Sequence, residues 1–134
     1  MIGLDTNVLL RLGDDDEPFQ RDRARALVRA QDAGGCFVNA IVLSEYAWTL
    51  GRFYKMPRGA IADRLTVLLE SSDFVVASGG EAQRAVRRFR EGAADFADYF
   101  LAEINAAAGC TTTATFDGDA LKSGGPFSPV PTLL

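Results

Sequence analysis

The sequence predicts an α/β fold, a three-layer α/β/α sandwich with a central, mostly parallel sheet of four to five strands. Short apolar runs alternate with longer segments in which apolar residues recur at helical spacing, a pattern typical of parallel sheets covered by helices. The length of 134 residues and the 48% hydrophobic composition suit one packed domain. Because no repeat or linker divides the chain, residues 1–134 are expected to form a single domain.

The first half of the chain is expected to hold two strands and three helices. Pro18 is suited to the first turn of a helix, and Gly34 and Gly35 are suited to its end. Asn39 is suited to an N-cap. The expected elements are a strand at 1–5, a helix from about Thr6, a helix over 18–33, a strand at 36–38 and a helix from Asn39 to about Tyr54.

The second half is expected to hold three helices and three strands. Pro57 and Asp95 mark helix starts, and Gly109 marks a helix end. The expected elements are a helix from Pro57, a strand at 74–77, a helix over 81–90, a helix over 95–108, a strand at 111–116 and a terminal strand near 130–133.

Composition excludes several kinds of chemistry. The chain contains no histidine, which excludes Ser-His and Cys-His nucleophilic pairs and metals bound by imidazole. The 18 acidic residues outnumber the 14 basic ones, and the net charge of −4 argues against a surface that coats nucleic acid. Any catalytic chemistry must therefore use carboxylates.

Cysteine usage and hydropathy indicate a cytoplasmic protein. Cys36 and Cys110 lie far apart without C-x-x-C spacing, and both are expected to be small buried residues. No apolar run approaches the roughly 20 residues that cross a bilayer, and the N-terminus lacks the features of a secretory signal. We therefore expect no membrane segment.

Four acidic residues stand at the ends of expected elements or in apolar surroundings. Asp5 and Asp117 each follow a strand, Asp98 lies in the first turn of a helix, and Glu45 lies on or near a helix face that must be buried. A purely structural role in a helix cap or a turn would also explain Asp5 and Asp117. A lone glutamate such as Glu45 is usually exposed or paired with an arginine. An α/β sheet can nevertheless place all four in one crevice beyond its strand ends.

Carboxylates gathered in one crevice repel one another unless a cation joins them. Ligands that are all oxygen suit Mg²⁺ or Mn²⁺ and disfavour zinc and copper. The pattern therefore predicts a hard-metal site, with Mg²⁺ as the first candidate and Mn²⁺ as a substitute.

The chain resembles the PIN-domain ribonucleases and, among them, the VapC-type toxins of bacterial toxin–antitoxin pairs. Four motifs carry the resemblance in the family's order: L-D-T-N-V-L-L-R-L, V-L-S-E-Y-A-W-T-L, A-D-F-A-D-Y-F-L-A-E and T-A-T-F-D-G-D-A. Tyr99 and Phe100 depart from the smaller or aliphatic residues that the family more often has there. The resemblance implies a PIN-like sandwich, cleavage of single-stranded or loop RNA, an antitoxin partner and a homodimer.

The resemblance also implies roles for individual residues. It makes Asp5, Glu45, Asp98 and Asp117 the catalytic and metal-binding acids, with Asp5 and Asp98 as the foremost ligands. The residues that it adds as auxiliary members of the site are Asp95, Asp119, Thr6 and Asn7. Helix capping explains Thr6 and Asn7 equally well.

Basic residues would have to hold the RNA, because the acidic site repels it without a metal. Arg84, Arg87 and Arg88 share one helix face, and Arg52 and Lys55 form a second candidate strip. A solvated helix surface explains such a run more often, and a contact with an acidic partner is a third explanation.

Two other kinds of function fit part of the pattern. A haloacid-dehalogenase-like phosphatase or a receiver domain also has an aspartate after a parallel strand, but Asn7 stands where the phosphatase needs its second aspartate. A PIN-like binding module without activity would use the acids only as caps. Glu45 argues against that module, because no cap requires it.

Overall fold

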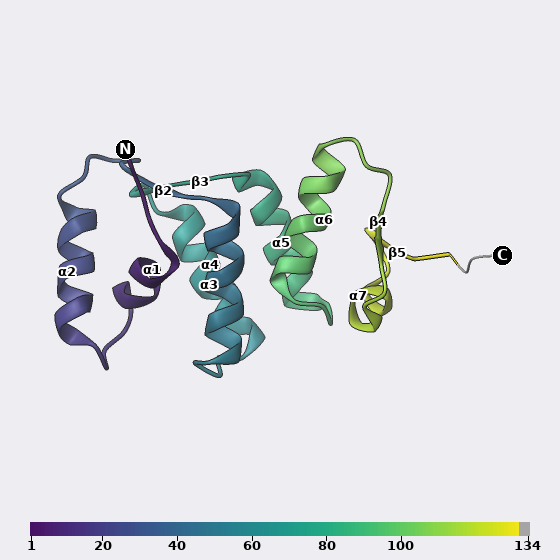
Figure 1. The fold of residues 1–134 in the computed structure, drawn as a ribbon, viewed down its shortest axis with the longest axis horizontal. Helices are drawn as coiled ribbons and strands as arrows, with labels where there is room; N and C mark the ends of the chain where they lie inside the picture. Colours follow the sequence, from purple (N-terminus) through teal and green to yellow (C-terminus); the bar gives the residue numbers. More distant parts are fainter. Residues whose placement is uncertain (132–134) are drawn as a thin grey trace.

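The computed structural model describes residues 1–131 and is built mainly of helices (Figure 1). The strands are β1 (Ile2–Gly3), β2 (Cys36–Val38), β3 (Phe74–Val76), β4 (Thr113–Thr115) and β5 (Phe127–Pro129). The helices are α1 (Thr6–Leu12), α2 (Pro18–Arg29), α3 (Ala40–Arg52), α4 (Arg58–Glu70), α5 (Gly79–Glu91), α6 (Phe96–Ala107) and α7 (Gly118–Ser123). All the pairings between these strands are parallel, so the expected α/β class is confirmed.

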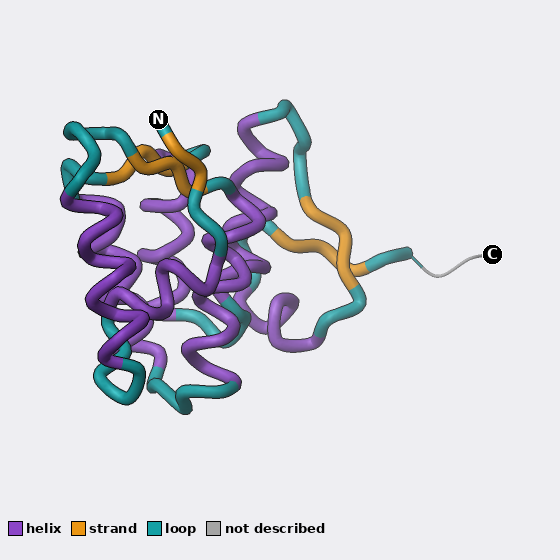
Figure 2. Tube along the Cα trace, turned by 60° about the vertical axis from the view of Figure 1, so that its left-hand side comes forward, coloured by secondary structure: helices purple, strands orange, loops and turns teal. Residues whose placement is uncertain are grey.

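The strands form two separate sheets, so the expectation of one central sheet of four to five strands is wrong for this structure. Strands β1, β2 and β3 pair in that order, with Ile2 opposite Cys36 and Cys36 opposite Phe74. Strands β4 and β5 form the second sheet, in which Thr113 lies opposite Phe127. Figures 1 and 2 both show the two sheets well apart, with the second sheet beside α6.

Contacts with α6 explain where the second sheet lies. The ring of Phe127 is buried 5.8 Å from the ring of Tyr99, measured between centroids. The hydroxyl of Tyr99 also shares a hydrogen bond with the hydroxyl of Ser123 in α7. Tyr99 therefore takes part in the contacts that hold α7 and β5 against α6.

The hydrophobic core lies mainly among α3, α4, α5 and α6. Helix α5 packs against both α4 and α6, and α3 packs against α6. The largest fully buried side chains are Tyr99, Phe96, Phe100, Leu43, Leu65, Val38 and Cys36. Three of these belong to the first two turns of α6, so tight packing fixes the position of the helix start that carries Asp98.

The local signals for helix starts are confirmed. Pro18 is the first residue of α2, and Asn39 caps α3 by accepting a hydrogen bond from the backbone N–H of Val42 (2.8 Å). Asp95 is the N-cap of α6. These signals depend on residues within one turn, which is why the sequence alone reveals them.

Several boundaries and environments differ from the expectations. Helix α2 ends at Arg29 and α3 at Arg52, each earlier than expected, whereas α5 already begins at Gly79. The last strand begins at Phe127, before the expected 130–133, of which residues 132 and 133 lie outside the described part. The short helix α7 was not expected. Cys36 is buried as expected, but Cys110 is exposed.

Candidate active site

Thr6 connects two of the expected acids. Asp5 is the N-cap of α1, and its carboxylate accepts a hydrogen bond from the backbone N–H of Thr6 (2.7 Å). The hydroxyl of Thr6, a buried residue, donates to the carboxylate of Glu45 on α3 (2.8 Å). Asp5 and Glu45 therefore bind the same residue, so the first motif contacts the second. Glu45 itself is exposed, contrary to the expectation that its helix face is buried.

Asp98 lies half-buried in the first turn of α6, among other acids. Its carboxylate accepts a hydrogen bond from the backbone N–H of Asp95 (3.3 Å). Burial raises the pKa of Asp98, this hydrogen bond opposes the rise, and the negative charges of Asp117 and Asp95 raise the pKa further. Within residues 1–131, Asp98 has no ion pair that would offset this repulsion.

Asp117 lies between β4 and α7 as the N-cap of that helix, and Asp119 lies in the first turn of α7. The carboxylate of Asp117 caps α7 by accepting from the backbone N–H of Asp119 (2.9 Å). Asp119 is exposed, and its carboxylate lies 3.9 Å from the ammonium of Lys122. Asp117 therefore has the capping role that its sequence position permits. Its negative charge also raises the pKa of Asp98.

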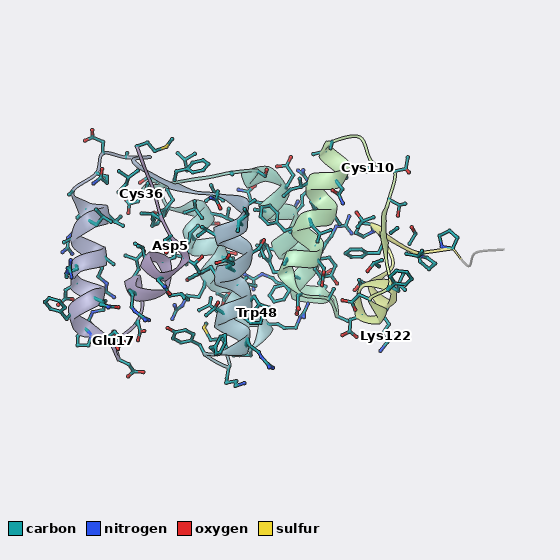
Figure 3. The ribbon with its side chains drawn as sticks, viewed as in Figure 1. Asp5, Glu17, Cys36, Trp48, Cys110 and Lys122 are labelled. Atoms are coloured by element: carbon teal, nitrogen blue, oxygen red, sulfur yellow. The ribbon has the colours of Figure 1, made fainter. Side chains whose placement is uncertain are left out.

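The four acids lie in two groups: an α1/α3 group of Asp5 and Glu45, and an α6/α7 group of Asp98 and Asp117. In the described part of the chain, no three Asp, Glu, Cys or His side chains lie close enough to hold a metal ion. Figure 3 shows Asp5 beside α1, on the left, and Lys122 of α7 on the right, beyond the central helices. The separation follows from the two sheets, because β1 leads to Asp5 and β4 leads to Asp117.

Packing brings the two groups onto adjacent helices. Glu45 lies in the middle of α3, Asp98 lies at the start of α6, and these helices pack against each other. The donors are carboxylate oxygens, with the Thr6 hydroxyl beside them. This set of donors is chemically suited to Mg²⁺ or Mn²⁺.

Glu103 is a buried acid that sequence reasoning missed. Its carboxylate is bound by the guanidinium Nε atoms of Arg88 (2.7 Å) and Arg84 (3.1 Å), and the residue is only 7% exposed. Burial raises the pKa of Glu103, but the hydrogen bonds and charges of the two arginines outweigh burial and hold it below its ordinary value. The available signal was the spacing of Arg84 and Arg88, which places both on one face of α5.

The ion pairs change how the basic residues are interpreted. Arg84 and Arg88 join α5 to α6 through Glu103, so two members of the expected RNA-binding cluster already have a structural role. Arg87, Arg52 and Lys55 are exposed, and they make no ion pair among residues 1–131. Lys55 adopts a left-handed backbone conformation (φ 56°) in the loop after α3.

Asn7 does not join either acid group through a side-chain hydrogen bond in the described part of the chain. It is exposed and lines a shallow cavity between α1 and α2, together with Arg11 and Gln20. Of the two auxiliary residues expected after Asp5, Thr6 is therefore the one that contacts the acids.

Comparison with known proteins identifies the family. Residues 2–124 match the PIN domain family, and this span contains all eight residues expected at the site. A search of curated proteins found no match. No helix in the described part of the chain is long and apolar enough to cross a membrane. Since the family match covers nearly the whole sequence, the chain belongs to the PIN domain family.

Proposed function

We propose that this protein is a metal-dependent endoribonuclease that cleaves single-stranded or loop RNA. PIN domains are generally nucleases, and the observation that carries the proposal here is the environment of Asp98. A half-buried carboxylate beside two further acids, with a raised pKa, opposes folding instead of supporting it. Such a loss of folding stability is expected where a bound cation or a substrate offsets the negative charge.

The metal is proposed to be Mg²⁺, with Mn²⁺ as a substitute. Asp5 and Asp98 are the foremost candidates to hold it, and Glu45 and Asp117 complete the set. When bound, such a metal supplies a water of lowered pKa and offsets negative charge on the phosphodiester. With no histidine in the chain, carboxylates are the residues left to bind it and to accept a proton.

The remaining residues support these four. Thr6 positions Glu45 by donating its hydroxyl hydrogen bond to that carboxylate (2.8 Å). Asp95 and Asp119 lie beside Asp98 and Asp117 as auxiliary acids. Arg87, Arg52 and Lys55, which are exposed, are the proposed contacts to the RNA backbone, where cations neutralise phosphate charge. Arg84 and Arg88 contribute through the guanidinium nitrogens that Glu103 leaves free.

We further propose that the protein is the toxin of a VapBC-type pair and acts in the cytoplasm as a homodimer. The support is the resemblance of the four motifs. An antitoxin that inserts an arginine between the acid groups would replace the metal's charge and relieve their repulsion. Expression of the protein alone should arrest growth. Co-expression with a small protein encoded beside it should relieve the arrest, and the two proteins should copurify.

The test of the activity is incubation of the purified protein with a short single-stranded RNA in Mg²⁺, Mn²⁺ or EDTA. Cleavage is expected with either metal and not with EDTA, leaving 5′-phosphate and 3′-hydroxyl ends. Asp5→Asn should remove the activity, because it removes a charged metal ligand while asparagine still caps a helix well.

Two results would contradict the proposal. Cleavage that persists in EDTA or in Asp5→Asn would point to a contaminating nuclease. A folded protein that binds RNA but cleaves none in either metal would instead indicate a PIN-like binding module without activity.

A further inference from the structure

A cavity lies between the C-terminal half of α3 and the start of α6. Its volume is about 320 Å³, within the roughly 300–1,000 Å³ typical of small-ligand pockets. The buried side chains of Ile61, Phe89 and Phe96 form its floor. The exposed residues at its rim are Trp48, Arg52 and Asp95.

Trp48 presents an aromatic surface at this rim. It is 52% exposed, although tryptophan is usually among the more buried residues, and Figure 3 shows it near the lower end of α3. The ring of Phe53 meets it edge to face, 5.6 Å away between centroids, and so supports its orientation. Gly51 also lines the cavity, and a Cβ there would come within 3.3 Å of Ile61, so glycine leaves this space open.

We propose that this cavity binds one base of the RNA substrate, with guanine as the preferred base. The assignment rests on the nuclease function proposed above. Trp48 provides a stacking surface, and Arg52, which has no ion pair within residues 1–131, provides a cation for the adjoining phosphate. The Asp95 carboxylate caps α6 by accepting from the backbone of Asp98, and its remaining lone pairs suit the two neighbouring N–H donors of a guanine edge.

The position of the cavity suits a substrate contact. Asp95 lies one helical turn before Asp98, and its backbone N–H donates to the Asp98 carboxylate (3.3 Å). A nucleotide held at Asp95 is therefore beside the α6/α7 acid group. Exposed cationic residues, Arg52 and Lys55, flank the exposed Phe53 in sequence, a combination of charge and aromatic surface that favours nucleic acid over an apolar protein partner.

Trp48 is the only tryptophan in the chain, so its fluorescence reports on this cavity directly. We would titrate the protein in EDTA with GMP, AMP, CMP and UMP, and with a short RNA and the same RNA carrying abasic positions. Saturable quenching is expected, tightest for GMP among the mononucleotides and lost with the abasic RNA.

Variants test the individual contacts by calorimetry. Trp48→Ala should weaken binding of GMP and short RNA at least about fivefold, the lower end of what one base stack contributes. Asp95→Asn should reduce the preference for GMP over AMP, while asparagine keeps the helix cap. Ile41→Ala is the matched control, since Ile41 lies on the same helix, is 69% exposed and does not line the cavity.

The possible outcomes separate the two proposals. Absence of saturable quenching, or unchanged affinity in Trp48→Ala, would overturn the base site even if the parent protein cleaves RNA. Base binding without metal-dependent cleavage would leave the base site standing and end the nuclease proposal. Sedimentation of the parent that changes with protein concentration alone, and no longer does so in Trp48→Ala, would show a contact between copies of the chain and refute the base site.

Discussion

Helix α6 carries two carboxylates, Asp98 and Glu103, in opposite surroundings. Glu103 is the more buried, but two arginines of α5 bind it and hold its pKa below the ordinary value. Asp98 is less buried, yet its charged neighbours are acids and its pKa is raised. The comparison teaches that burial alone does not mark a functional acid. Among the described residues Asp98 has no compensating cation, and this is the feature that makes it a candidate ligand, because a group from outside could then balance its charge.

The largest expected effect is that of Asp98→Asn on RNA cleavage. Loss of an outer-shell partner of a metal typically costs about 10- to 100-fold in activity, and loss of a direct ligand should cost more. The free energy of unfolding should stay the same or rise, because the variant removes one negative charge from a repulsive group. Cleavage assays and urea unfolding measure the two quantities.

Thermal melting with Mg²⁺ provides the control for Asp98→Asn. A metal that binds only the folded state raises the Tm of the parent, and the rise should be smaller in the variant. If Asp98→Asn is active and Mg²⁺ raises its Tm as much as that of the parent, Asp98 is not a metal ligand. The functional difference drawn between Asp98 and Glu103 would then be wrong.

Glu103→Gln should have the opposite balance, with a loss of stability and little direct effect on cleavage. The variant weakens two charge-assisted hydrogen bonds, worth roughly 1.5–3 kcal/mol each, but both arginines are nearly half exposed and keep contact with water. We expect a loss of about 1–3 kcal/mol in the free energy of unfolding. Glu91→Gln, an exposed change near the end of α5, is the control and should leave it almost unchanged.

Thr6→Val should reduce cleavage by about tenfold, the lower end for a residue that positions a ligand. It removes the hydroxyl that donates to Glu45, an acid that has no ion pair among residues 1–131, and it nearly preserves the side-chain shape. Thr6→Ser should restore activity by restoring the hydroxyl. Equal activity in Thr6→Val and the parent would show that this hydrogen bond is only structural.

The pH dependence of stability should have opposite signs at the two acids. The pKa of Glu103 is lowered on folding, so its contribution is present above the ordinary carboxyl pKa and is lost as pH falls through the lowered value. The pKa of Asp98 is raised on folding, so its penalty is full above the raised value and disappears as pH falls below the ordinary one.

Unfolding of the parent and both variants between neutral and acidic pH tests these signs. The advantage of the parent over Glu103→Gln should shrink as pH falls, and so should the advantage of Asp98→Asn over the parent. Parallel curves for parent and variant would contradict the corresponding assignment.

The helix starts, and the places of the candidate acids at element ends, were predictable because their signals are local. Pro18, Asn39 and Asp95 mark helix starts through bonds within one turn, and Asp5 and Asp117 follow their strands directly. The order of the four motifs along the chain likewise indicates the PIN family, which the match over residues 2–124 confirms. A local pattern of this kind needs no knowledge of what packs against it.

The tertiary structure alone decided which of these residues meet. The contact of Tyr99 with Phe127 holds β4 and β5 against α6, so the strands form two sheets and the acids form two groups. The pairing of Glu103 with Arg84 and Arg88 likewise joins helices whose relative position no local signal encodes. Sequence by itself determined the kinds of side chain and their places on helices and strands. Long-range packing decided their neighbours, and the neighbours determine whether a carboxylate is neutralised or left for a ligand.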